Sequence, residues 1–159
     1  MLAVNEGQSS MTGTIYIFNG PNLNLLGERE PEVYGRDTLA DVEAMCRAVA
    51  EPAGYALELR QSNSESEIVE WFQGARTGAA GIVFNPAAFS YASYPILDAI
   101  KLVDCPVIEV HISNIYRRAE AWRAKSIISQ VATATLSGLG VQGYALAVAH
   151  IIWLKGREK

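Results

Sequence analysis

Long apolar runs, excess positive charge and cysteine-rich segments are all missing from this chain. No apolar run reaches the roughly 18 residues that a membrane-spanning helix needs, so we expect no membrane segment. The formal net charge of −4 speaks against a general nucleic-acid surface. The two cysteines, Cys46 and Cys105, lie in apolar surroundings, which predicts buried free thiols in a cytoplasmic protein.

The composition is that of one ordinary globular domain. The chain has 159 residues, of which 50% are hydrophobic and 19% charged, enough for a sizeable core. Residues 1–13 are small and polar and lack the apolar centre of a signal peptide, so we expect a disordered extension. We expect a single catalytic domain over residues 14–154 and a charged, frayed tail over residues 155–159.

Short apolar runs alternate with segments of helical periodicity along the whole domain. The expected strands are residues 14–18, 56–60, 81–84, 107–110 and 129–136. The expected helices are residues 39–53, 64–75, 94–103, part of 114–123, and 143–153. Five such units without a linker predict an α/β fold with one open, five-stranded parallel sheet covered by helices on both faces.

Polar side chains follow four of the expected strands at the point where each strand ends. They are Asn19 and Asn22, residues 61–63, Asn85, and His111 with Ser113 and Asn114. The carboxyl ends of parallel strands share one edge of a sheet, and open α/β sheets bind ligands there. Four polar ends together, one with a histidine, predict a site for a polar small molecule.

The connection after the first strand, residues 19–35, is unusually rich in functional groups. Asn22 and Arg29 can fix an anion, and Tyr34 can abstract a proton if its phenol is deprotonated. A free phenol has a pKa of about 10, and a nearby cation favours the phenolate. The segment 28–35 is polar and dense in charge, so we expect it to close over a substrate as a lid.

Six motifs resemble those of type II 3-dehydroquinate dehydratase, in the right order and spacing. The motifs are residues 19–27 (NGPNLNLLG), 30–35 (EPEVYG), 60–63 (RQSN), 85–86 (NP), 109–114 (EVHISN) and 138–144 (GLGVQGY). The resemblance implies a flavodoxin-like fold and loss of water from 3-dehydroquinate to give 3-dehydroshikimate in the shikimate pathway. It further implies no metal, no cofactor, no covalent intermediate and a dodecameric assembly.

The resemblance also implies catalytic roles for five residues of this sequence. Tyr34 matches the base, Arg29 the cation that favours its phenolate, and Asn22 a residue that stabilises the enolate. His111 matches the acid that protonates the departing hydroxyl. Glu109 lies two residues before His111 on the same strand face and can orient the imidazole or raise its basicity.

Substrate binding is implied for a second group of residues. Asn85 and the backbone at Ile112 and Ser113 match positions that bind the carboxylate and hydroxyls. Arg123 matches a substrate-binding arginine if one extra residue is allowed between Arg118 and Arg123, and Arg117 or Arg118 is its competitor. Asp98 matches an acid that pairs with the lid arginine or reaches across from a neighbouring subunit.

The sequence departs from the family pattern at the substrate-binding end. Tyr91 stands where the family has a histidine, Leu97 where many relatives have a basic residue, and Ala87 where glycine is usual. The proton-transfer residues are unchanged. This leaves a second interpretation open: a paralogue with altered substrate binding, which acts in quinate breakdown or binds without turnover.

Two other ligands fit parts of the sequence less well. Residues 138–143 have the glycine spacing of a dinucleotide fingerprint, but only 16 residues follow, too few for the ribose-binding acid and the next βαβ unit. An FMN carrier needs a phosphate loop rich in serine and threonine after the first strand. The connection here has asparagine and proline instead.

Overall fold

The computed structural model describes residues 11–158, so most of the expected disordered extension lies outside the described residues. One parallel sheet runs through the molecule with the strand order β2-β1-β3-β4-β5. Its strands are β1 (Gly13–Asn19), β2 (Tyr55–Gln61), β3 (Ala79–Asn85), β4 (Val107–His111) and β5 (Ala134–Ser137). The predicted five-stranded parallel sheet is confirmed.

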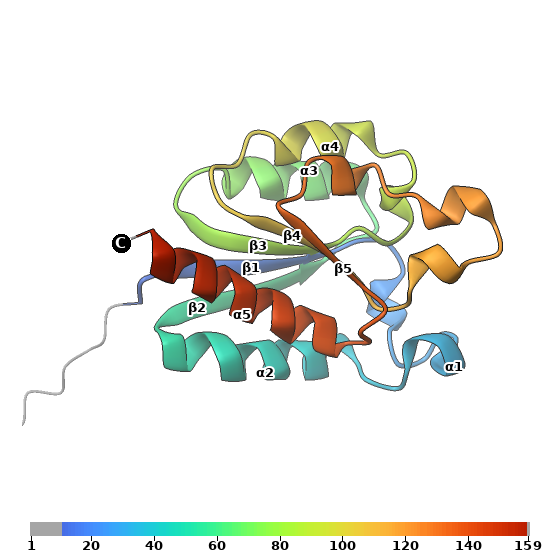
Figure 1. The fold of residues 1–159 in the computed structure, drawn as a ribbon, viewed down its shortest axis with the longest axis horizontal. Coiled ribbons are helices and arrows are strands. Elements are labelled where there is room, and N and C mark those ends of the chain that lie inside the picture. The colour runs from blue at the N-terminus through green and yellow to red at the C-terminus, as the bar shows by residue number, and fades with distance from the viewer. Residues whose placement is uncertain (1–10, 159) are drawn as a thin grey trace, which may run out of the picture.

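Helices cover both faces of the sheet, as the sequence predicts (Figure 1). The helices are α1 (Pro31–Tyr34), α2 (Leu39–Ala50), α3 (Glu65–Gly74), α4 (Tyr94–Ile100) and α5 (Gln142–Arg157). Helices α2 and α5 pack together on one face, and α3 and α4 on the other. Short α1 lies apart from both layers, at one end of the sheet.

Each layer has its own apolar core. On the α3–α4 face, the rings of Phe18, Phe72 and Phe84 are fully buried and meet edge to face at 5.1–5.2 Å between centroids. On the α2–α5 face, Ile151 and Ile17 are fully buried. Every residue of β3 is buried because helices cover both of its faces, which explains why the strand shows no alternation. Burying each of these large side chains contributes about 1.5–3 kcal/mol.

The helix starts follow from local side-chain chemistry. Thr38 and Asp41 form a capping box at the start of α2: the Thr38 hydroxyl accepts from the Asp41 amide, and the Asp41 carboxylate accepts from the Thr38 amide. Ser64 caps α3 by accepting from the Glu67 amide at 3.3 Å. These caps fix where the connections after β1 and β2 end.

Two expected elements differ from the structure. Residues 129–136 do not form one strand: a 3-10 helix spans Ile128–Gln130, and only Ala134–Ser137 joins the sheet. Fully buried Ile128 anchors that turn in the core, so its β-branched character serves packing rather than a strand. At the other end, α5 continues through Lys155 to Arg157, three residues into the stretch expected as tail, with Lys155 Nζ donating to Glu158 at 2.9 Å.

One glycine brings two strand ends together. The Gly20 amide donates to the Asn85 carbonyl at 2.8 Å, and a Cβ at residue 20 would collide with the Pro86 carbonyl. Only glycine allows this approach. It draws the connection after β1 against the end of β3, which places the two loops beside one cavity.

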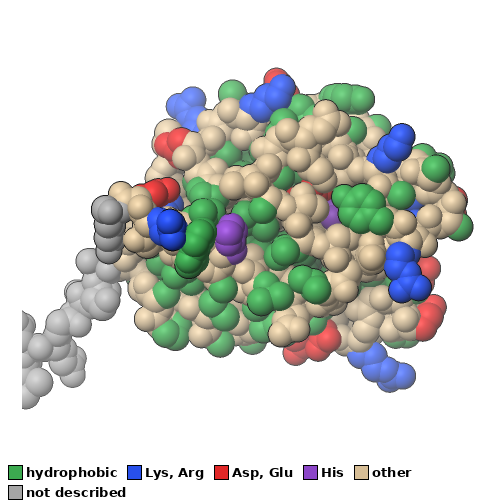
Figure 2. All heavy atoms as spheres, viewed as in Figure 1, with side chains coloured by type: hydrophobic (Ala, Val, Ile, Leu, Met, Phe, Trp, Pro, Cys, Tyr) green, Lys and Arg blue, Asp and Glu red, His purple; other side chains and the backbone are tan. Residues whose placement is uncertain are grey.

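The face seen in Figure 2 carries acidic and basic side chains scattered around its edge, with no broad patch of one sign. Within residues 11–158, no helix is long and apolar enough to cross a membrane.

Candidate active site

A cavity of about 380 Å³ lies where the carboxyl ends of β1, β3 and β4 meet the loops that follow them. It brings together most of the residues predicted for the site. These are Asn22, Arg29, Tyr34, Asn85, Tyr91, His111, Ile112, Ser113 and Arg123. They come from segments far apart in the sequence, as the pattern of polar strand ends predicts.

The end of β2 supports Asn22 from behind. Asn22 has a left-handed backbone with φ 67°, and its amide donates to the Asn63 side chain at 2.9 Å. Gln61 donates to that same Asn63 oxygen at 3.1 Å and to the Gly20 carbonyl at 3.2 Å. The matching motif at residues 60–63 therefore shapes the Asn22 turn rather than the cavity surface.

Arg29 and Tyr34 line the cavity from the loop that carries α1. Arg29 is half exposed, and its Nε lies 3.3 Å from a Glu30 carboxylate oxygen. Tyr34 is half-buried at the end of α1, and residues 28–33 around it are exposed. The base and cation expected from the sequence thus share a rim that is weakly packed.

Asp98 does not join this site. It lies on the exposed side of α4, outside the cavity, and the carboxylate beside Arg29 belongs to Glu30. A pairing of Asp98 with Arg29 within one chain is therefore not formed in this structure.

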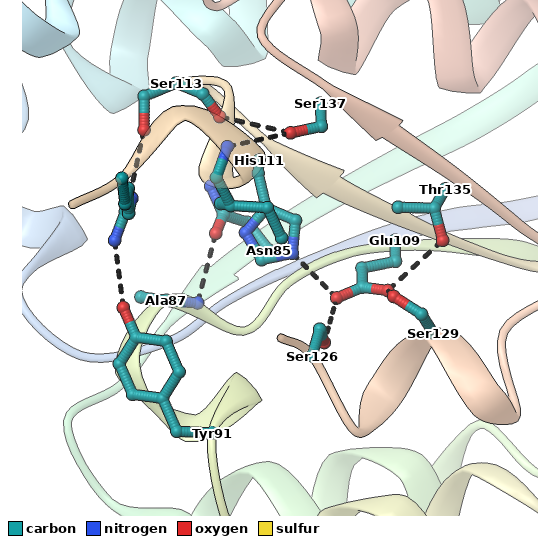
Figure 3. Close-up of polar contacts among 12 residues, drawn as sticks. Asn85, Ala87, Tyr91, Glu109, His111, Ser113, Ser126, Ser129, Thr135 and Ser137 are labelled. Carbon is teal, nitrogen blue, oxygen red and sulfur yellow. Dashed lines mark hydrogen bonds and ion pairs between the residues drawn. The ribbon is translucent and has the colours of Figure 1, made fainter. Parts of the chain in front are cut away.

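His111 and Glu109 point to one side of β4, as two residues apart on a strand should (Figure 3). His111 Nε2 lies 2.7 Å from Glu109 Oε1, and both side chains are buried. Burial alone raises the pKa of Glu109, but hydrogen bonds from His111, Ser126 and Ser129 outweigh it and hold that pKa below its ordinary value. An ionised carboxylate only accepts, so we assign the hydrogen in this bond to Nε2.

The tautomer has a consequence for the cavity. With Nε2–H committed to Glu109, the Nδ1 atom of His111 is the nitrogen left to exchange a proton. Because His111 lines the cavity whereas Glu109 does not, Glu109 acts through the imidazole.

Tyr91 and Ser113 are joined by an arginine that was only a competitor in the sequence. Arg118 donates to the Tyr91 phenol at 2.9 Å and to the Ser113 hydroxyl at 2.8 Å, two bonds visible at the left of Figure 3. Trp122, 62% exposed, meets the Tyr91 ring edge to face at 4.8 Å. The phenol that replaces the family's histidine is therefore an acceptor for a cation that lines the cavity.

Arg123 lines the same wall. Its NH1 lies 3.6 Å from Glu120, and its guanidinium lies 6.0 Å from the Trp122 ring. Interaction with Tyr91, and more weakly with Glu120 and Tyr34, raises the pKa of Arg123 above its ordinary value. The structure thus places both candidate arginines at the cavity, and Arg118 is the one held by two hydrogen bonds.

A buried chain of polar groups supports the floor. Asn85 donates to the Tyr144 hydroxyl at 2.8 Å, and that hydroxyl donates to Asn19 at 2.7 Å. Burial raises the pKa of Tyr144 far above its ordinary value, which keeps the phenol neutral. Asn85 also accepts from the Ala87 amide at 3.1 Å. Tyr144, from the motif at residues 138–144, was not among the predicted site residues.

Two glycines of that motif have structural roles. A Cβ at Gly138, where φ is 86°, would lie 2.8 Å from the Asn114 side chain, and Gly140 has a φ of 61°. Local backbone geometry therefore accounts for these two glycines without a dinucleotide. Among residues 11–158, no three His, Cys, Asp or Glu side chains gather in a way that could hold a metal ion.

Comparison with known proteins agrees with the geometry. The family described as Dehydroquinase class II matches residues 13–152. A curated relative, 3-dehydroquinate dehydratase 2 of Agrobacterium fabrum, is 55% identical over 142 residues, which cover 89% of this chain and 96% of the relative. The 3-dehydroquinate dehydratase of Streptomyces coelicolor is 52% identical over 150 residues, covering 94% of this chain and 95% of the relative.

A solved structure gives the same answer for the fold. The type II dehydroquinase from Propionibacterium acnes superposes with a TM-score of 0.83 at 40% identity, covering 90% of this chain and 98% of that one. The resemblance seen in the six sequence motifs is confirmed, and the chain belongs to the class II dehydroquinase family.

Proposed function

We propose that this protein is a hydro-lyase that removes water from 3-dehydroquinate to give 3-dehydroshikimate in the shikimate pathway. Curated relatives named 3-dehydroquinate dehydratase match almost their full length. The observation that carries the proposal is the cavity, where Tyr34 and His111 line one space although 77 positions separate them (111 − 34). One phenol and one imidazole suit a reaction that removes one proton and donates another.

Tyr34 is the proposed base. As a phenolate it takes the proton beside the ketone, which leaves an enolate. Arg29, on the same rim of the cavity, supplies the positive charge that favours the phenolate once Glu30 no longer neutralises it. Asn22, held by Asn63, stabilises the enolate oxygen through a preorganised hydrogen bond.

His111 is the proposed acid. As an imidazolium it keeps Nε2–H on Glu109 and carries a second proton on Nδ1, which passes to the departing hydroxyl as the carbon–oxygen bond breaks. The products are one water and the conjugated enone, with the imidazole left neutral and the abstracted proton on Tyr34. Glu109 holds Nε2–H and keeps the imidazole oriented throughout. Because Glu109 is buried, solvent does not compete for this bond.

The substrate carboxylate and hydroxyls meet the opposite wall. Arg118, held between Tyr91 and Ser113, offers a fixed positive charge, and Arg123 adds a second. Asn85 and the backbone at Ile112 and Ser113 complete the polar surface. A planar guanidinium suits a carboxylate because it can donate two parallel hydrogen bonds.

Residues 28–35 are the proposed lid. Residues 28–33 are exposed and Arg29 pairs with its neighbour Glu30, whereas Tyr34 packs against the edge of the apolar core. Closure brings Arg29 and Tyr34 to the substrate and excludes water. Limited proteolysis tests this: a competitive inhibitor should slow cleavage within residues 28–35, and unchanged cleavage would contradict a lid.

The assembly is proposed from the family resemblance as a dodecamer in the cytoplasm. Asp98, exposed on α4, is then placed to reach the Arg29 of a neighbouring subunit. Light scattering coupled to gel filtration gives the mass directly. A monomer with full activity would remove the need for a residue from a second chain.

Turnover of 3-dehydroquinate, followed by the ultraviolet absorbance of the enone, tests the proposed function. We expect steady formation of product by the wild-type protein and almost none by His111→Ala. Tyr91, which replaces the family's histidine, favours the second candidate, a paralogue that binds without turnover or serves quinate breakdown. Saturable binding of 3-dehydroquinate without any product would support that candidate instead.

A further inference from the structure

Glu109 is a carboxylate with no exposed surface and four hydrogen-bond donors (Figure 3). His111 Nε2 and the Ser126 hydroxyl contact Oε1. The Ser129 hydroxyl contacts Oε2, and Thr135 Oγ1 donates to Oε2 from 3.2 Å. Three hydroxyls and one imidazole therefore satisfy both oxygens.

The donors come from β4, from β5 and from the segment between these two strands. Thr135 is the register partner of Glu109 on β5, and Ser126 and Ser129 come from the turn that fully buried Ile128 anchors. The register partner on β3 is Phe84, which is uncharged. Among the described residues, His111 is the titratable side chain in contact with Glu109.

We propose that Ser126 and Ser129 are positioning residues that hold the Glu109 carboxylate ionised and fixed, and that this fixes His111 with Nε2–H toward Glu109 and Nδ1 toward the cavity. The catalytic meaning of this inference rests on the proposed function. The arrangement itself concerns only side chains of this chain.

The physical reason is the choice of neutral donors. A buried carboxylate without donors takes up a proton, because the charged form is poorly solvated there. A protonated Glu109 would offer its own hydrogen to Nε2 and leave the imidazole without a fixed tautomer. A second cation would hold the carboxylate too, but it would compete with His111 for the negative charge. Hydroxyls hold the carboxylate and leave its charge for the imidazolium.

The chain allows a clean test because it has only two histidines. In a His150→Gln background labelled with ¹⁵N-histidine, His111 gives the single imidazole signal. Long-range proton–nitrogen correlation spectra recorded over a series of pH values show which imidazole nitrogen carries the hydrogen. They also give the pH at which Glu109 takes up a proton and stops accepting from Nε2. His150 is an exposed α5 residue stacked on Trp153, away from the cavity.

In the Ser126→Ala/Ser129→Ala double variant, we expect the pH at which Nε2 loses its carboxylate partner to rise by about 1–2 units. This is the size that loss of hydrogen bonds to a charged group implies. Each single variant should move it less, in the same direction, which covers a double variant that does not fold. The Ser126→Thr/Ser129→Thr variant, which keeps both hydroxyls, should restore the wild-type value. Ser66→Ala, at an exposed position of α3, is the matched control and should leave the spectra unchanged.

Activity separates this inference from the proposed function. The acid side of the kcat profile should begin to fall at higher pH in the alanine double variant. If the wild type turns over 3-dehydroquinate and the spectra of wild type and alanine variants coincide at every pH, the inference is overturned and the proposed function stands. If the wild type gives no product but the pH at which Nε2 loses its carboxylate partner rises as expected, the proposed function fails and the positioning role stands.

Discussion

The floor of the cavity and its rim differ in how firmly their side chains are held. On the floor, buried polar groups are fully bonded: Glu109 to His111, and Asn85 to Tyr144. On the rim, Arg29 is half exposed and Trp122 is mostly exposed. Under the proposed mechanism, the acid is thus held ready before substrate arrives, whereas the proposed base and its cation must be brought into place. We infer that substitutions of floor residues change both turnover and the free energy of unfolding, whereas substitutions of rim residues change turnover alone.

The largest expected effect comes from the rim. Tyr34→Phe should lower kcat by about 10²–10⁴-fold, since it removes the proposed base. The free energy of unfolding should change by less than about 0.5 kcal/mol, because the hydroxyl lies at a weakly packed surface. Steady-state kinetics and urea unfolding measure the two quantities. Tyr116→Phe, at an exposed position outside the cavity, is the control.

A large loss of stability in Tyr34→Phe would contradict the difference between floor and rim, because the rim would then contribute to the folded core. Unchanged kcat in that variant would remove Tyr34 as the base and leave the rest of the site in place.

The matching change on the floor is Glu109→Gln. It should lower both kcat and the free energy of unfolding, the latter by about 2–3 kcal/mol at pH 7, since it removes a buried, fully bonded charge. The pKa of Glu109 is depressed in the folded state below its ordinary 4.5. Its contribution to stability is therefore complete above pH 4.5 and is lost as pH falls through the folded pKa.

Urea unfolding at a series of pH values measures this difference. The gap between wild type and Glu109→Gln should be largest near neutral pH and should shrink in acid. A gap that stays constant down to the lowest pH at which both proteins fold would mean that Glu109 is not held ionised by its neighbours.

Tyr91 lies between the floor and the rim, and two substitutions test whether it contributes to substrate binding. Tyr91→Phe removes the acceptor of Arg118 and should lower kcat/KM about tenfold, mainly through KM, because one bond to a partly exposed cation is lost. Tyr91→His restores the family pattern and should raise turnover if the substrate is 3-dehydroquinate. Equal kinetic constants in all three proteins would show that position 91 is neutral.

The sequence predicted the sheet, its helices and the gathering of polar strand ends, because each follows from local pattern. It did not predict what holds those ends. Ser129 lies 20 positions from Glu109 in the chain, and its hydrogen bond depends on the 3-10 helix at Ile128–Gln130, whereas that of Thr135 depends on how β4 and β5 align. The β-branched residues within 129–136 favoured a strand, and only the packed core shows that the first part of this stretch belongs to a turn anchored by Ile128.

The contacts of the cavity wall were harder still to predict from the sequence. The sequence comparison assigned substrate binding to Arg123 and kept Arg118 only as a competitor. Their difference is geometric: Arg118 reaches both Tyr91 and Ser113. Trp122 carried no motif, and Tyr144 contributes through a bond to Asn85 that spans 59 positions. Contacts between distant segments leave no periodic signal in a sequence.

The smallest expected effect concerns a strained turn beneath the cavity wall. Ala87, where the family usually has glycine, has φ 49°, a left-handed conformation that costs a residue with a Cβ about 1 kcal/mol. Its amide is fixed by Asn85, so the turn should keep its shape in Ala87→Gly. We expect this variant to gain up to about 1 kcal/mol in unfolding free energy, since glycine relieves the strain. Ala88→Gly, the next residue, lacks a positive φ and should instead lose about 0.5–1 kcal/mol. Opposite signs in thermal unfolding would show that the floor carries strain at residue 87, and equal losses in both variants would show that it does not.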